Sequence, residues 1–157
     1  MIKILHRGNQ INLDLNTSTF TGVATKDNFL AYMESLKAGK LVGVDSNGKV
    51  ALADGLTVKA IGFVVVDASA NPVDNYPAVA SKKLAVTLGD CVVETDQIEA
   101  SVNITAGQLV YASATASNVG TLTNVQPTGS GDEVGSPIGV ALTSCTAQIR
   151  TIQIAKF

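Results

Sequence analysis

The sequence predicts an all-β (mainly β) fold: a small β-barrel or sandwich with an internal repeat, one short helix and an extended N-terminal arm. Short runs rich in Val, Thr and Ala recur along the chain, separated by Gly, Asn, Asp and Ser. Runs and separators of this kind are typical of strands and their turns. Two segments also resemble each other, and 157 residues suit one compact domain.

Residues 1–20 form either an N-terminal arm or a first hairpin, and residues 21–157 form the single β domain. Apolar and polar residues alternate over 2–4 and 11–15, which indicates strands, and Gly8-Asn9 between them is a turn signal. In the hairpin interpretation the two strands pair with each other. In the arm interpretation the segment becomes ordered by adding a strand to a partner.

Residues 26–37 (KDNFLAYMESLK) predict the one short helix, which we expect to plug an open end of the β core. Thr25 or Asp27 suits the start of this helix, and Gly39 lies just past its end. Apolar residues with helical spacing give it one buried face: Phe29, Leu30, Met33 and Leu36.

Strands are predicted from residue 38 onward. Asn47-Gly48 predicts a hairpin with a type I′ turn. Residues 84–94 predict either another strand pair or one bent strand, with Gly89-Asp90 as the kink. Alternation over 98–104 predicts a further strand. Residues 124–136 are rich in Gly, Pro and Ser and predict a loop, after which 138–143 and 146–154 complete the sheet.

An internal repeat has halves at about 38–69 and 106–144. AGKLVGV (38–44), NGKVAL (47–52) and AIGFVV (60–65) match AGQLVYA (106–112), NVGTL (118–122) and PIGVAL (137–142). We expect Gly39 and Gly107 to supply turns with positive φ, which β-branched residues avoid. Gly62 and Gly139 lie inside strands, where glycine marks a bulge or a close backbone approach.

No motif predicts catalysis, a metal site or a cofactor, so we expect a protein that is not an enzyme. His6 is the single histidine, so a nucleophile elsewhere in the chain lacks a histidine base. Cys91 and Cys145 lack the spacing of metal ligands, so we expect two buried thiols. GSGDEVG (129–135) lacks the Lys-Ser/Thr of a phosphate-binding loop. A solvated rim is expected of the densest acidic group, Asp90, Glu94, Asp96 and Glu99.

Composition excludes further classes of function. With 11 Lys and Arg against 13 Asp and Glu, the chain has no basic field to hold nucleic acid. No apolar run of about 18 residues is present to span a membrane, and Lys3, His6 and Arg7 break any signal-peptide pattern, so we expect a chain made in a cytoplasm. Few charges (15%) and a mean hydropathy of +0.28 predict surface that other subunits or a partner cover.

The C-terminal three quarters of the chain resemble a known family. ASVNITAGQLVYASATASNVGTLTN, SPIGVALTS and TAQIRTIQIAKF resemble the capsid decoration (cement) proteins of tailed bacteriophages, and KAGKLVGVDSNGKV and LAVTLGDCVVE fit earlier parts of the same pattern. The resemblance covers roughly residues 37–157. It is carried by Thr105, Ala106, Gly107, Val110, Tyr111, Ile138, Gly139, Val140, Ala141, Ile149, Ile152 and Ile154.

The resemblance implies a β-barrel-like homotrimer on the outer surface of an icosahedral phage capsid. Such a virion protein, made in the bacterial host cytoplasm, clamps neighbouring subunits of the major capsid protein after shell expansion. It has no active site or cofactor and binds no nucleic acid or membrane. We expect the N-terminal arm to contact the capsid through Ile2, Ile4, Ile11, Leu13 and Leu15.

Two other classes of function fit the sequence less well. One is another virion β-module, such as a head-fibre base, a tail component or an adhesin domain. The other is a carbohydrate-binding or small-ligand domain, or a weak hydrolase. A concave pocket lined by aromatic and carboxylate side chains would distinguish this last class.

Overall fold

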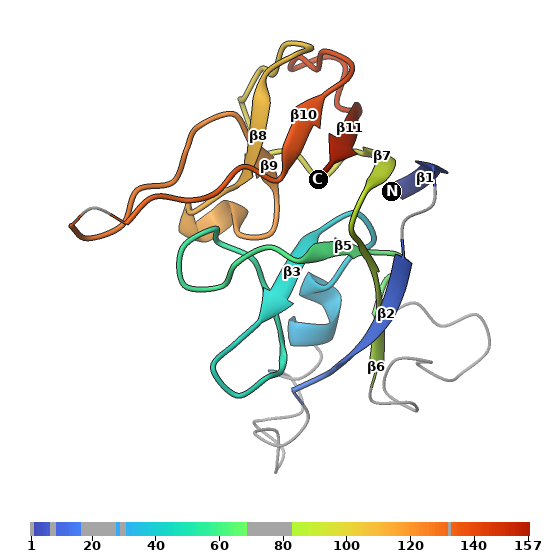
Figure 1. Ribbon diagram of the computed structural model, residues 1–157, viewed down its shortest axis with the longest axis vertical. Helices are drawn as coiled ribbons and strands as arrows, with labels where there is room; N and C mark the ends of the chain where they lie inside the picture. Colours follow the sequence, from blue (N-terminus) through green and yellow to red (C-terminus); the bar gives the residue numbers. More distant parts are fainter. Residues whose placement is uncertain (1, 7–8, 17–27, 29–30, 69–82, 132) are drawn as a thin grey trace.

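The computed structural model describes residues 2–6, 9–16, 28, 31–68, 83–131 and 133–157. It confirms a mainly β fold, in which two antiparallel sheets pack as a sandwich-like pair and do not close into a barrel. Six strands form sheet A, in the upper half of Figure 1, and five strands form sheet B below it.

The spatial order of strands differs from their order in the chain. Sheet A has the order β1 (Ile2–His6), β7 (Cys91–Thr95), β11 (Ile152–Lys156), β10 (Gly139–Ala141), β8 (Leu109–Ala112) and β9 (Leu122–Thr123). Sheet B has the order β2 (Asn9–Asp14), β6 (Lys83–Leu88), β5 (Gly62–Val64), β3 (Leu41–Val44) and β4 (Val50–Leu52). A short 3-10 helix, η1, covers Ala116–Asn118.

The first two strands lie end to end and do not pair with each other. β1 pairs with β7 from Ile2↔Thr95 onward, and β2 pairs with β6 as far as Asp14↔Lys83, with one irregularity near His6. The N-terminal segment therefore runs from sheet A (β1) to sheet B (β2). The segment formed by β6 and β7 lies beside it and runs antiparallel, from sheet B to sheet A. This arrangement replaces the hairpin interpretation of residues 1–20.

The internal repeat is visible in the sheet topology. In sheet B the first strand of the repeat, β3, lies between β4 and β5; in sheet A its counterpart, β8, lies between β9 and β10. The register also agrees, because Val42 pairs with Gly62 and Val110 pairs with Gly139. The next two strands of each sheet also correspond. Beyond β5, sheet B continues with β6 and then β2; beyond β10, sheet A continues with β11 and then β7.

The glycines that open each repeat have the same role. Gly39 and Gly107 have φ of 88° and 89°. Each donates its N–H over 2.8 Å to the third strand of its repeat, Gly39 to Val64 O and Gly107 to Ala141 O. The prediction of positive-φ turns at these two positions is confirmed.

Two apolar clusters give the sandwich its core. The first lies between the sheets and joins Leu41 and Phe63 of sheet B to Val110, Ile152 and Ile154 of sheet A. The second lies on the other face of sheet B, beneath Met33 and Leu36. Sheet B is therefore covered on both faces, whereas sheet A contributes one face to these clusters.

The helix is placed differently from our expectation. Asn28 and residues 31–35 are helical, while Thr25, Asp27, Phe29 and Leu30 lie outside the described residues. Met33 and Leu36 are buried as predicted, in the second cluster. Because the sheets do not close into a barrel, this helix covers a face of sheet B and does not plug an open end.

Two local predictions were wrong in detail. The hairpin at Asn47-Gly48 forms, but Gly48 alone has positive φ, and Gly48 N–H donates to Asp45 O, so the turn is type I followed by a glycine bulge. Residues 98–104 form no strand. They turn at Ser101, whose φ is 65°, and contribute only isolated bridges at their two ends.

Candidate functional site: the open edge of the N-terminal ribbon

The N-terminal ribbon, which we define as residues 2–6 and 9–16, holds all five residues predicted to contact a capsid. Leu15 is buried in the second cluster, and Leu13 packs against that cluster. Ile2 and Ile4 pack against the first cluster. Ile11 alone is classed as exposed, at 36%. Packing within the chain thus accounts for the apolar character of the other four, and their contact with a capsid stays a prediction.

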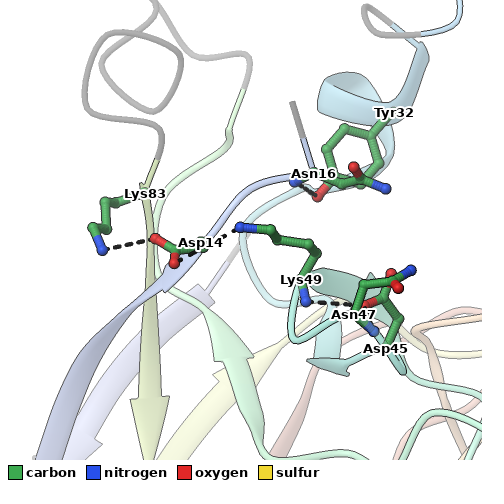
Figure 2. Close-up of polar contacts among 7 residues, drawn as sticks. All are labelled: Asp14, Asn16, Tyr32, Asp45, Asn47, Lys49 and Lys83. Carbon is green, nitrogen blue, oxygen red and sulfur yellow. Dashed lines mark hydrogen bonds and ion pairs between the residues drawn. The ribbon is translucent and has the colours of Figure 1, made fainter. Parts of the chain in front are cut away.

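An ion-pair group anchors the end of β2 (Figure 2). Lys83 Nζ donates to Asp14 Oδ1 over 2.7 Å, and Lys49 Nζ lies 3.9 Å from Asp14 Oδ2. The hydrogen bond and charge of Lys83 hold the pKa of Asp14 below its ordinary value. These side chains are largely solvated, so we assign the group to register and position more than to stability.

A tyrosine links the ribbon to the body of sheet B. Tyr32 Oη donates to Val50 O over 2.8 Å and accepts the N–H of Asn16 over 3.2 Å. Burial raises the pKa of Tyr32, which keeps the hydroxyl protonated as this donor. One side chain of the helix therefore ties Asn16, two residues past the end of β2, to Val50 on β4. Figure 2 shows the contact between Tyr32 and Asn16.

The hairpin beside this link is stiffened by an aspartate. Asp45 Oδ1 accepts N–H bonds from Asn47 over 2.8 Å and from Lys49 over 2.9 Å. An aspartate that satisfies its own turn in this way fixes the hairpin without a tertiary partner. The hairpin in turn presents Lys49 to Asp14.

The backbone groups of β2 alternate between β6 and the opposite edge. Val65 N–H donates to Ala85 O over 3.1 Å, so the odd-numbered residues of β6 face β5 and the even-numbered ones face β2. The register partners of those even-numbered residues are Asn9, Ile11 and Leu13. The β2 residues that direct N–H and C=O away from β6 are therefore Gln10, Asn12 and Asp14.

This outward edge of β2 corresponds to an edge that is occupied in the other repeat. β7 holds the place in sheet A that β2 holds in sheet B, and β1 pairs with β7 on its outer side. Val92 and Glu94 are the β7 residues at the positions of Gln10 and Asn12. Within the described part of the chain, no strand pairs with the outer side of β2.

Two surface hollows differ from the pocket that a carbohydrate site would need. The larger, about 480 Å³, lies between the helix and η1 and is lined in part by Glu34, Lys37 and Lys40. Burial, and then the charge of Lys37, lower the pKa of Lys40. The other, about 280 Å³, lies beside Pro137 and Ile138. Neither hollow has an aromatic side chain in its lining.

The predicted acidic rim divides into separate contacts. Asp90 is exposed, whereas Glu94 accepts a hydrogen bond from Gln153. Glu99 Oε1 accepts bonds from Thr115 and Asn118; burial raises the pKa of Glu99, but hydrogen bonds lower it further, and the balance is a lowered value. Glu94 within β7 and Glu99 in the loop after it therefore accept hydrogen bonds from neighbouring parts of the fold.

The described residues form no disulfide and no metal-binding group. Cys91 and Cys145 are free and buried, as predicted. Among the described residues, no group of three or more His, Cys, Asp or Glu side chains could hold a metal ion. None of the helices in that part of the chain has the length and apolar character needed to cross a bilayer.

The outward backbone of Gln10, Asn12 and Asp14 was missed from the sequence. The alternation drew attention to five apolar residues, and the fold packs four of these against its own core. The polar residues Gln10, Asn12 and Asp14 were visible in the same alternation. Whether their backbone groups face an open edge depends on which strand pairs with β2. Comparisons with protein-family models, with curated proteins and with solved structures found no match.

Proposed function

We propose that this chain is a structural virion protein that decorates a tailed-phage capsid. In this proposal a homotrimer binds the outer surface of the icosahedral shell and cements neighbouring subunits of the major capsid protein. The proposal is supported by the motif resemblance over residues 37–157 and by composition. The single observation that carries it is the outward-facing backbone of Gln10, Asn12 and Asp14 on β2.

An open strand edge suits a clamp. An extended segment of a capsid subunit that adds beside β2 gains main-chain hydrogen bonds in a fixed direction. The anchors at Asp14 and Tyr32 keep β2 in place when such a segment pulls on it. Sheet A already uses the equivalent position for β1, so the twist and spacing of this fold accept a strand there.

Many copies on one lattice make modest contacts sufficient. A specific interface buries at least about 1,000 Å² in total. A trimer that engages several capsid subunits converts later contacts into intramolecular ones, which raises overall avidity by orders of magnitude. The protein then holds the seam between subunits without any chemical step.

The experiment is co-sedimentation of the purified protein with expanded, undecorated capsids. Asn12→Pro removes one outward N–H while leaving the pairing of β2 with β6, and Asn12→Ala is its control because it keeps that N–H. We expect the wild type and Asn12→Ala to co-sediment, and Asn12→Pro to bind at least about tenfold more weakly, a loss of about 1.4 kcal/mol.

Two results would contradict the proposal. If the wild type stays in the supernatant, the decoration function is wrong. If Asn12→Pro occupies the shell as fully as Asn12→Ala, the β2 edge is not the contact. Deleting residues 1–16 would be a poorer test, because it also removes Leu15 from the core.

A further inference from the structure

The outer face of sheet A is an apolar surface that the two core clusters do not use. We define the outer face by the side chains of sheet A that alternate with those of the first cluster. The exposed Leu109 (43%) on β8 belongs to it, and the exposed Leu142 (47%) directly follows β10. Its half-buried apolar members are Val92, Val140 and Ala155.

Four of these side chains stand in one cross-strand row. Val92 on β7 is paired with Ala155 on β11, Ala155 with Val140 on β10, and Val140 with Leu109 on β8. Directly paired residues on one face of a sheet have neighbouring Cβ atoms. The row is therefore a continuous apolar strip across four strands.

The same row exists in the other repeat, where it is an interface. In sheet B the equivalent row runs Gln10, Thr87, Phe63 and Leu41 in matching register. Phe63 and Leu41 are fully buried there, because sheet A covers them. Within one molecule, the row of sheet B is thus covered by sheet A, which has the same strand arrangement.

The charges of the outer face are self-complementary. Lys3 and Glu94 are register partners on β1 and β7, and Glu94 also accepts a hydrogen bond from Gln153. Among the described side chains of this face, one cation and one anion offset each other, so these charges favour neither an acidic nor a basic partner. In a ring of three copies, Lys3 of each copy can lie against Glu94 of the next, so one surface supplies both charges of the contact.

We propose that copies of this chain associate with one another through the outer face of sheet A, with the Val92–Ala155–Val140–Leu109 row at the centre of the contact. The proposal rests on the self-association included in the proposed function, and it does not depend on the capsid. It also assigns a role to the apolar surface that the composition predicts.

The test is analytical ultracentrifugation of the capsid-free protein over a range of concentrations. Leu109→Lys and Val140→Lys place a charge in the row, whereas Val66→Lys places the same charge at a 57%-exposed position that follows β5 of sheet B. We expect the wild type and Val66→Lys to sediment as multiples of the 16.1 kDa chain. Both row variants should self-associate at least about tenfold more weakly, because a buried unpaired charge is costly.

Far-UV circular dichroism shows whether each variant is folded; Leu109→Lys is the safer variant because its side chain is exposed. A monomeric wild type at every concentration would overturn the proposal, as would a folded Leu109→Lys with undiminished self-association. Co-sedimentation with capsids is scored separately. An oligomer that does not bind capsids would contradict the decoration function but not the proposed interface between copies.

Discussion

At the scale of single residues, the glycines inside strands determine how closely neighbouring strands lie. A Cβ built on Gly62 would meet Thr87 O and the side chain of Val86, and one on Gly139 would meet Ala155 O and the side chain of Ile154. Backbone oxygens cannot move aside as a flexible side chain can. The predicted close approach at both positions is therefore confirmed.

We predict that Gly62→Ala lowers the free energy of unfolding by about 3 kcal/mol or more, because the new methyl group overpacks against the backbone of β6. The matched control is Gly48→Ala. Gly48 has open space around it, so only its φ of 71° opposes alanine, at about 1–2 kcal/mol. Urea unfolding measures both variants, and equal losses would contradict the close-approach argument.

Tyr32 supports a second prediction at this scale. Tyr32→Phe leaves Val50 O and Asn16 N–H without the hydroxyl, and we expect a loss of about 1–2 kcal/mol near neutral pH. Tyr111→Phe is the control, because no hydrogen bond of the Tyr111 hydroxyl is found among the described residues.

The pH dependence of Tyr32 has a definite sign. Burial raises its pKa in the folded state, so above the ordinary value of 10.0 the unfolded chain loses this proton first. The stability that the tyrosine contributes is thus present below pH 10 and falls as the pH rises through the folded pKa. The difference between wild type and Tyr32→Phe should shrink in alkaline urea titrations, and a constant difference would contradict this assignment.

Some residue roles could be read from the sequence and others could not. Positive φ at Gly39 and Gly107 and the buried thiols followed from local chemistry. The turn at Asn47 did not, because Asp45 accepts two N–H bonds there and favours a type I turn over the type I′ that Asn-Gly suggests. A local side-chain contact outweighed the dipeptide preference.

At the scale of elements, the N-terminal ribbon shows what alternation can and cannot predict. Alternation correctly indicated two strands, since period two is a local property. It could not identify their neighbours, because β6 and β7 lie about eighty residues away in the chain. The choice between arm and hairpin depended on that non-local pairing. The same pairing decides that the backbone N–H and C=O of Asn12 face away from β6.

We predict that two aliphatic truncations in this ribbon differ strongly. Leu15→Ala leaves a cavity in the second cluster and should cost about 2–5 kcal/mol. Ile11→Ala removes a 36%-exposed side chain from the same ribbon and should cost less than about 1.5 kcal/mol. Thermal or urea unfolding compares them. Similar losses would mean that the ribbon is not integrated with the core as the packing indicates.

At the scale of the whole molecule, the two repeats are stacked in the same sense. The strand face that contains Val42 in sheet B has Val110 as its equivalent in sheet A, and both are buried. Val42 packs under the helix, whereas Val110 packs on the opposite face of sheet B. Sheet A thus covers the face of sheet B that lies opposite the helix. The equivalent face of sheet A is the outer face, which neither core cluster covers.

This stacking makes the sheets one cooperative unit, which Phe63→Ala tests. Phe63 belongs to sheet B but lies in the first cluster with the strands of sheet A, so its truncation should cost about 3–5 kcal/mol. Hydrogen exchange should then show lost amide protection in β10 and β11 as well as in β3 and β5, because the same cavity removes contacts from both sheets. Val50→Ala, which acts on the second cluster alone, is the control and should reduce protection mainly in sheet B. Protection lost only in sheet B for Phe63→Ala would mean that the repeats fold independently, and that the apolar row they share does not serve as an interface even within one chain.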